Sequence, residues 1–242
     1  ICASEQSIVT EEVIKNQVVD ELKKQGAYFL NKDERNKVGS ILMRANNTMN
    51  PKIVGKTALY IAAMAGITVP TTTKILVSEE TEVSHLNPYS REKLCPVLGF
   101  YTEETWEKAC EKCIEILENE GIGHTMSMHT NNENIVREFS LKKPVSRLLV
   151  NTAAALGGVG ATTNLLPAFT LGCGTVGGSA TSDNIGPLNL INIRRVAYGT
   201  KELEELKEEG SCVNTCSVDN SRVNENEIED IIRKVLDGII KK

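Results

Sequence analysis

Two residue types in this sequence could perform nucleophilic or acid–base chemistry near neutral pH, namely cysteine and histidine. The cysteines are Cys2, Cys95, Cys110, Cys113, Cys173, Cys212 and Cys216, and the histidines are His85, His124 and His129. A thiol becomes a nucleophile when a neighbouring charge, dipole or hydrogen bond favours its thiolate. Histidine is the side chain whose ordinary pKa lies nearest neutrality. Sequence context must therefore decide which of these residues is chemically active.

Two short motifs have simple structural interpretations. Cys110 and Cys113 form a CxxC pair of the kind that binds zinc or undergoes redox chemistry. Both share one stripe of a predicted helix with Trp106, which favours packing in a core, and no second ligand pair is suitably placed. In NPKIVGKT, Asn50 stands where a phosphate-binding loop needs its first glycine. We therefore expect neither a metal site nor a nucleotide-phosphate loop.

Composition limits the classes of function. The 242-residue chain is 40% hydrophobic, which allows one substantial core or two small ones. Its net charge of -5 argues against nucleic-acid and membrane-surface partners, since both require a clustered positive field. No apolar run reaches the roughly 18 residues of a membrane-spanning helix. An odd number of cysteines without a secretory signal indicates reduced thiols and a cytoplasmic location.

Alternating strand and helix patterns predict an α/β fold with a largely parallel sheet flanked by helices. Apolar runs bounded by turn residues predict strands at residues 5–9, 74–78, 97–101, 124–130, 146–152 and 190–196. Helical spacing and end signals predict helices at residues 10–24, 33–45, 55–66, 105–118 and 134–141. Thr10 is the predicted N-cap of the first helix, and the third is apolar enough all round to be buried.

A glycine-rich stretch follows Asn151. Residues 157–187 contain many glycines and show little periodicity. Glycine permits positive φ angles and close approach of the backbone to a ligand, so a long ordered loop of this composition indicates a functional role.

The C-terminal part has a different character. Residues 200–224 form a charge-rich segment and a polar linker. Residues 225–242 carry apolar residues at helical spacing, namely Ile228, Ile231, Ile232, Val235, Leu236, Ile239 and Ile240. An amphipathic helix on a linker indicates docking to a groove or a partner. The alternative is a helix that packs on the protein's own oligomer.

Several motifs occur in order along the chain. They are ICASEQS around Cys2, REKLCPVLGFY from Arg91, GIGHT from Gly121, and then LLVNTAAALGGVG, FTLGCGTVGGS and NIGPLNLIN. Together they resemble the CoA-acylating aldehyde dehydrogenases, including the aldehyde dehydrogenase half of bifunctional alcohol/aldehyde dehydrogenases. Each piece is weak alone, but the ordered set covers most of the chain and is specific. The resemblance implies that residues 1–199 form an aldehyde dehydrogenase-like, thioester-forming catalytic domain.

The resemblance implies NAD-dependent oxidation of a short-chain aldehyde, of the acetaldehyde or propionaldehyde type, to acyl-CoA. Cys2 matches the family's catalytic cysteine, whose thiolate attacks the aldehyde carbonyl to give a thiohemiacetal. Hydride passes to NAD and leaves a thioacyl-enzyme, which the thiol of coenzyme A then attacks. The backbone N–H of Cys2 is one candidate donor to the oxyanion.

The same resemblance implies further site residues. Glu92 matches the glutamate that holds the nicotinamide ribose, and Leu94 matches the apolar residue that packs against the nicotinamide. His124 matches the histidine of the acylating branch, and it could assist proton transfer from the thiol of coenzyme A or position coenzyme A. The glycine loop would line the aldehyde pocket through Thr170, Cys173 and Gly174.

One departure from the family pattern affects the expected activity. The family carries its NAD-binding half mainly before the catalytic cysteine, and that half is absent from this sequence, which does not begin with Met. We therefore expect a fragment or processed chain. It would hold the acyl-transfer half of the site and the edge of the NAD site, and would not oxidise aldehyde by itself.

The predicted C-terminal helix resembles the encapsulation peptides that direct aldehyde dehydrogenases into bacterial microcompartments. This implies shell proteins as partners of residues 225–242 and a location inside such a compartment. The family assembles through strands that reach across subunits, and residues 190–196 are the candidate here, so we expect a homo-oligomer. The alternative function is a non-catalytic assembly or docking module of a microcompartment. The intact ICASEQS and EKLCPV motifs favour the enzyme.

Overall fold

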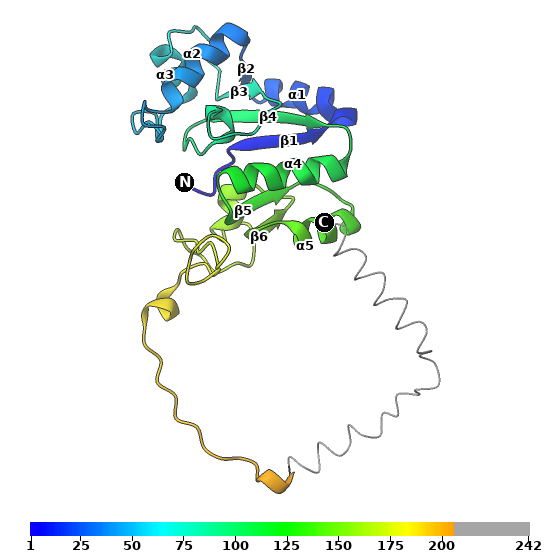
Figure 1. Cartoon of the computed structure of the whole chain (residues 1–242), viewed down its shortest axis with the longest axis vertical. Helices are drawn as coiled ribbons and strands as arrows, with labels where there is room; N and C mark the ends of the chain where they lie inside the picture. The colour runs from blue at the N-terminus through cyan, green and yellow to red at the C-terminus, as the bar shows by residue number, and fades with distance from the viewer. Residues whose placement is uncertain (206–242) are drawn as a thin grey trace, which may run out of the picture. The chain divides into compact units, whose positions relative to one another are not determined.

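The structure is a computed structural model that describes residues 1–205 (Figure 1). Most of the predicted linker and the whole predicted helix at residues 225–242 lie outside the described residues. The chain divides into two units, Ile1–Ile191 and Asn192–Lys242. The first unit contains every helix and strand named below.

Two parallel sheets form the framework of the first unit. The larger has the strand order β1-β4-β3-β2 and is made of β1 (Ser7–Glu11), β2 (Ala27–Phe29), β3 (Ile75–Glu79) and β4 (Val97–Glu103). The smaller pairs β5 (Gly123–Met128) with β6 (Val145–Val150). All pairings between these strands are parallel. The predicted α/β fold with a parallel sheet flanked by helices is confirmed, with the strands divided between two sheets.

Helices connect the strands. They are α1 (Lys15–Lys24), α2 (Lys32–Leu42), α3 (Ala58–Met64), α4 (Trp106–Asn119), α5 (Glu133–Lys142) and α6 (Ala154–Gly158). Side-chain caps fix several starts: Asn31 forms a capping box with Glu34 at α2, and Thr105 caps α4. Within residues 1–205, no helix has both the length and the apolar character needed to cross a membrane.

Helix α4 lies between the two sheets (Figure 1). Its Cys110 forms a small core with Met128 of β5 and Phe139 of α5, against which Trp106 and Cys113 pack. A larger core joins α2 and α3 to the central strands through Val38, Leu42, Ile53, Ala58, Ile61, Ala62, Leu76, Tyr89 and Val97. The stripe predicted from the CxxC spacing is therefore a packing stripe.

The N-terminal elements differ from prediction in their boundaries. Thr10 is not an N-cap: it is a buried residue of β1, which pairs with β4 through Glu11. The chain then makes a 3-10 turn over Glu12–Ile14 before α1 begins. Strand pairing thus overrides the local capping signal. The three-residue edge strand β2 was not predicted, because so short a run shows no periodicity.

Two further predictions are wrong. Helix α3 is shorter than predicted and is buried on one face through Ala58, Ile61 and Ala62, whereas Leu59 and Tyr60 are exposed. Residues 190–196 form no strand: a 3-10 turn ends at Leu190, and the residues after Ile191 have no regular structure. An apolar run forms a strand when a neighbouring strand can accept its hydrogen bonds, and none pairs with this run within residues 1–205.

Candidate functional site

Cys2 lies in a turn that leads into β1. The turn is closed by a hydrogen bond from the Ser4 N–H to the Ile1 carbonyl oxygen, at 3.0 Å. Cys2 is exposed, while the adjacent Ala3 is buried. Within residues 1–205, the Cys2 Sγ makes no hydrogen bond, so the described part of the structure presents it as an accessible thiol.

The two residues before β1, Glu5 and Gln6, connect the Cys2 turn to the start of α6 and to the loop that carries Glu92. The Glu5 carboxylate accepts a hydrogen bond from the Ala154 N–H at the start of α6, at 2.8 Å. The Gln6 amide oxygen accepts one from the Lys93 N–H, at 2.9 Å. Strands β1 and β4 are parallel neighbours, so the chain segments that enter them, with Cys2 and Glu92, lie at the same edge of the sheet.

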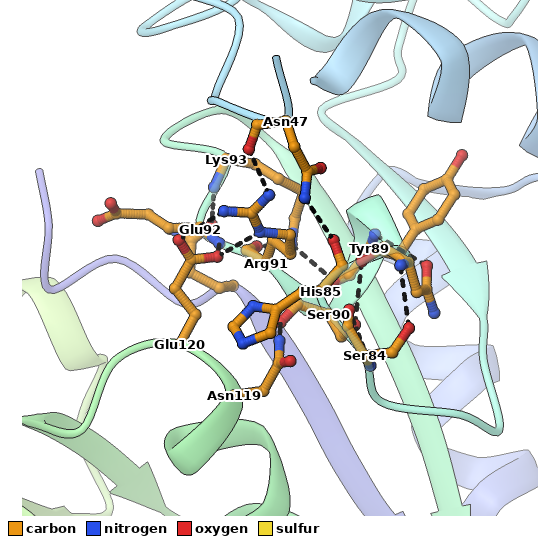
Figure 2. A network of polar contacts seen from close by, with 12 residues as sticks. Asn47, Ser84, His85, Tyr89, Ser90, Arg91, Glu92, Lys93, Asn119 and Glu120 are labelled. Atoms are coloured by element: carbon orange, nitrogen blue, oxygen red, sulfur yellow. Dashed lines mark hydrogen bonds and ion pairs between the residues drawn. The ribbon is translucent and has the colours of Figure 1, made fainter. Parts of the chain in front are cut away.

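Glu92 belongs to a polar network that ends in a free carboxylate. Arg91 makes two hydrogen bonds to Glu120, at 2.9 and 3.2 Å, and Glu120 also accepts the Glu92 N–H at 2.9 Å. Figure 2 shows the Glu92 carboxylate directed away from this ion pair. It accepts no hydrogen bond within residues 1–205. Burial, and then the charge of Glu120, raise the pKa of Glu92 above its usual value.

Lys93 stabilises the loop that carries Glu92 through hydrogen bonds in the protein interior. Its side chain is fully buried, and its Nζ donates to the carbonyl oxygens of Tyr89 and Arg91, at 2.8 and 2.6 Å (Figure 2). Burial lowers the pKa of Lys93 to about 8. A buried amine is costly, and here it satisfies two carbonyl groups that shape the turn preceding Glu92.

Leu94 adopts a backbone conformation that is unusual for its residue type. Its φ angle is 50°, in the left-handed region that favours glycine. Its carbonyl oxygen accepts a hydrogen bond from the Gly55 N–H at 3.0 Å. Strain of this kind is held by the surrounding structure and concentrates at functional positions. The Leu94 side chain is half-buried, two residues after Glu92.

His124 lies in β5 and is half-buried. Its Nδ1 is 2.9 Å from the Thr125 Oγ1. Burial, and then the nearby Arg147 guanidinium, lower the pKa of His124. The imidazole is thereby kept neutral at neutral pH.

The glycine-rich loop packs against β5 and α6. Residues Leu171 and Asn184 form an antiparallel bridge, and the buried Asn184 side chain donates to the carbonyl oxygens of Gly158 and Leu166, at 2.9 and 2.8 Å. A Cβ atom on Gly123 would lie 2.2 Å from the Cys173 carbonyl oxygen. The approach of the loop to β5 therefore requires glycine at position 123.

The three predicted pocket residues occupy this loop. Thr170 is exposed, and its carbonyl oxygen accepts the Ile185 N–H at 2.9 Å. Cys173 is half-buried, and Gly174 has a φ angle of 63°. Arg147 lies close enough to the Cys173 and Cys2 thiols for both to counteract the lowering of its pKa by burial. The loop and the Cys2 turn therefore belong to one electrostatic neighbourhood.

The structure thus brings the Cys2 turn beside both the Glu92 loop and the glycine loop. No hydrogen bond within residues 1–205 joins the side chains of Cys2, Glu92 and His124 to one another. Sequence reasoning missed the residues that connect the motifs, namely Glu5, Gln6, Lys93, Glu120, Thr125 and Arg147. The sequence contained a signal that could have identified Arg147, because a charged residue inside an apolar strand must find buried partners.

The CxxC pair is a structural feature. Cys110 is buried, and burial raises the pKa of Cys113 to about 12, which disfavours its thiolate. No cluster of three metal-binding side chains occurs in the part of the chain that the structure describes. Cys212 and Cys216 lie outside it.

Comparison with known proteins identifies relatives over most of the chain. The sequence is 40% identical over 202 residues to an aldehyde-alcohol dehydrogenase of Clostridium acetobutylicum, covering 81% of this chain and 23% of that protein. No protein-family model matches the sequence. From the 23% coverage, the chain spans about a quarter of the length of the Clostridium acetobutylicum protein.

Two solved structures agree with the fold. A probable aldehyde dehydrogenase from Listeria monocytogenes is 59% identical, with a TM-score of 0.81 over 85% of this chain and 46% of that one. An acetylating aldehyde dehydrogenase from Geobacillus thermoglucosidasius is 49% identical, with a TM-score of 0.80 over 84% of this chain and 45% of that one. By sequence and by fold, the chain is a homologue of the acetylating aldehyde dehydrogenases and corresponds to less than half of such an enzyme.

Proposed function

We propose that this chain supplies the catalytic cysteine and the adjoining half of the active site of an NAD- and CoA-dependent acylating aldehyde dehydrogenase. The substrate class is a short-chain aldehyde of the acetaldehyde or propionaldehyde type, and the product is acyl-CoA. The supporting observation is the double attachment of the Cys2 turn: Glu5 binds the start of α6, and Gln6 binds the Glu92 loop. These contacts connect the Cys2 turn to the Glu92 loop and to α6, against which the glycine loop packs.

Cys2 is the proposed nucleophile. Its thiolate adds to the aldehyde carbonyl, so the C–S bond forms as the carbonyl oxygen becomes an oxyanion. The Cys2 backbone N–H is available as a donor to that oxyanion. The exposure of Cys2 leaves its Sγ open to a substrate.

Glu92 and Leu94 fit the edge of a dinucleotide site. A half-buried carboxylate that accepts no hydrogen bond within residues 1–205 can accept two from a diol, and the ribose of NAD provides one. Leu94, which follows two residues later with a strained backbone, supplies the apolar side chain for the nicotinamide. When bound, NAD supplies the acceptor for the hydride of the thiohemiacetal. The role of this chain is to hold the ribose and the nicotinamide edge.

His124, Thr170, Cys173 and Gly174 form the proposed acyl-transfer side. The glycine loop lines the aldehyde pocket, with Cys173 as a wall residue. His124 lies on the neighbouring strand and acts on coenzyme A. The thiolate of coenzyme A displaces the Cys2 sulfur from the thioester, which returns the enzyme thiolate and releases acyl-CoA.

Turnover requires groups that this chain does not hold. We therefore propose that the isolated 242-residue chain forms no NADH from a small aldehyde, NAD and coenzyme A, whereas the complete protein does. NADH formation by the isolated chain would disprove this part of the proposal.

The decisive test is a cysteine substitution in the complete protein. Cys2→Ala should abolish aldehyde-dependent NADH formation and remove the thiol that alkylates fastest at neutral pH. Cys113→Ala is the matched control, because its thiol lies in a core and has a pKa near 12. Activity that is indifferent to Cys2→Ala would reject the enzyme and favour a docking or assembly module.

Assembly partners are a separate proposal. We propose a homo-oligomer, and we propose residues 225–242 as a segment that docks to shell proteins of a bacterial microcompartment. Deletion of residues 225–242 from the complete protein should reduce co-purification with shell proteins and leave aldehyde oxidation intact. Unchanged co-purification would contradict cargo targeting.

A further inference from the structure

Arg147 is a buried cation that has no acidic partner among the described residues 1–205. It lies in β6 and is 4% exposed. Its Nε donates to the Thr125 Oγ1 at 3.1 Å, and its Nη1 donates to the Ser182 carbonyl oxygen at 2.9 Å. Its Nη2 donates to the Gly172 carbonyl oxygen, and no carboxylate within residues 1–205 pairs with it. Burial of an unpaired charge is expensive, so this arrangement calls for a functional explanation.

The Thr125 hydroxyl links Arg147 to His124. A guanidinium can only donate hydrogen bonds, so the Thr125 Oγ1 must accept from the Arg147 Nε. The hydroxyl still has one proton to donate. The His124 Nδ1, at 2.9 Å, lies within reach of that proton.

The opposite proton arrangement is less favourable. If the His124 Nδ1 carried a proton, it would donate to an oxygen that already accepts from a cation. The hydroxyl proton of Thr125 would then need another acceptor, and none contacts it within residues 1–205. Burial and the Arg147 charge also oppose a doubly protonated ring. The neutral ring with its proton on Nε2 gives the Thr125 hydroxyl proton an acceptor and leaves the Nε2–H group available to a ligand.

We propose that Arg147 and Thr125 are positioning residues that hold His124 as the neutral tautomer protonated on Nε2. Building on the proposed function, this makes the Nε2 atom a hydrogen-bond donor to the thioester oxygen or to the sulfur of coenzyme A. The Nε2 atom is then not the base that removes the proton from the thiol of coenzyme A. This choice resolves the two roles that the sequence leaves open for His124.

The first experiment reads the tautomer directly. The complete protein is labelled with nitrogen-15 in its histidine rings, and the His124 signals are assigned by their loss in His124→Gln. At pH 7 the spectrum should show a protonated Nε2 and an unprotonated Nδ1. A protonated Nδ1, or a doubly protonated ring, would overturn the proposal. The exposed His129 provides the internal reference.

A pair of substitutions at position 125 tests the hydrogen-bond chain that runs from Arg147 through Thr125 to His124. Thr125→Val removes the hydroxyl at nearly constant shape and should produce a mixture of tautomers. Thr125→Ser keeps the hydroxyl and should retain the Nε2 tautomer. Arg147→Met should raise the pKa of His124, whereas Arg137→Gln, at an exposed arginine, should leave it unchanged. An unchanged His124 spectrum in Thr125→Val would overturn the proposal even if Arg147→Met fails to fold.

The kinetic consequence falls on one half-reaction. Thr125→Val should slow transfer of the acyl group to coenzyme A by roughly tenfold, less than the roughly 10²–10⁴-fold that a proton-transferring side chain typically contributes, because His124 itself remains in place. The NADH burst that precedes acyl transfer should change little, and Thr125→Ser should restore the rate. The tautomer is measured without turnover. A protein that oxidises no aldehyde but shows the Nε2 tautomer would therefore reject the proposed function and leave this inference standing.

Discussion

At the scale of single residues, the most informative feature is a charge that the protein tolerates without a partner. Glu92 is half-buried and accepts no hydrogen bond within residues 1–205, yet an elaborate network holds its backbone. Lys93, by contrast, is buried for a structural reason, because its Nζ satisfies two carbonyl groups. Neighbouring side chains in one motif therefore have different surroundings within residues 1–205.

Replacement of Glu92 should separate function from stability. Glu92→Gln should weaken NAD binding at least about tenfold in the complete protein, because glutamine offers one uncharged acceptor oxygen in place of the two charged oxygens of a carboxylate. The raised pKa of Glu92 means that the folded state favours the protonated form, so ionisation above this pKa lowers stability. The uncharged glutamine should leave stability at pH 7 unchanged or raise it by up to about 1 kcal/mol.

Isothermal titration with NAD and chemical denaturation measure the two effects. Glu82→Gln, at an exposed glutamate, is the control for both. Loss of both NAD binding and stability in Glu92→Gln would show that Glu92 is structural.

Lys93 gives a prediction for stability against pH. Burial lowers its pKa to about 8, below the roughly 10.4 of an unfolded lysine. Between these values the unfolded state binds more protons, so the contribution of Lys93 to stability rises as pH increases. Relative to Lys93→Met, the wild-type free energy of unfolding should rise by up to about 3 kcal/mol between pH 7.5 and 10.5.

Denaturant unfolding of the wild type and of Lys93→Met across this pH range tests the direction in which their difference in stability changes with pH. Lys52→Met, at an exposed lysine, should show no such slope. If the free energy of unfolding of the wild type, relative to that of Lys93→Met, falls as pH rises, the folded state favours the charged amine.

At the scale of elements, alternating patterns predicted most strands and helices, because each buries one face. The prediction from local sequence patterns failed where a contact between residues far apart in the sequence determines the structure. Thr10 reads locally as a helix cap, but pairing with β4 draws it into β1. For the site, the sequence predicted candidate residues such as Cys2 and Glu92, but not the contacts that join their motifs. Gln6 and Lys93 are far apart in sequence, and no local pattern links them.

Two nearby glycines provide a matched test of the loop packing. Gly121 and Gly123 both have positive φ angles, of 115° and 81°. A Cβ atom at Gly121 would meet nothing within 4 Å, whereas one at Gly123 would overlap the Cys173 carbonyl oxygen and Gly177. Gly121→Ala should cost about 1 kcal/mol of stability for the backbone alone.

Gly123→Ala should cost about 3 kcal/mol or more, because it adds steric overlap to the same backbone strain. It should also shift the glycine loop and change the labelling rate of Cys173. Equal effects of the two substitutions, by chemical denaturation, would show that the loop does not pack on β5 as described.

At the scale of the whole molecule, the described chain leaves apolar side chains exposed around position 190. Leu190 and Ile191 at the end of the first unit are 80% and 58% exposed, and Ile193 in the second unit is 48% exposed. Exposed apolar side chains of this kind are candidates for an interface. The sequence predicts a strand at residues 190–196, and the missing element is a neighbouring strand to receive its hydrogen bonds. A second copy of the protein could provide that strand, by augmentation of a sheet edge across subunits.

This pairing predicts a change of oligomeric state in the complete protein. Ile191→Asp with Ile193→Asp should lower the molar mass measured by light scattering after size exclusion. Each isoleucine that is fully buried in an interface contributes roughly 1.5–3 kcal/mol, so the paired change should weaken association more than a hundredfold. Leu188→Asp changes an exposed leucine outside the predicted strand and should leave the mass unaltered. If the double variant keeps the wild-type mass, or if the wild type is a monomer, residues 190–196 are not the strand that joins the subunits.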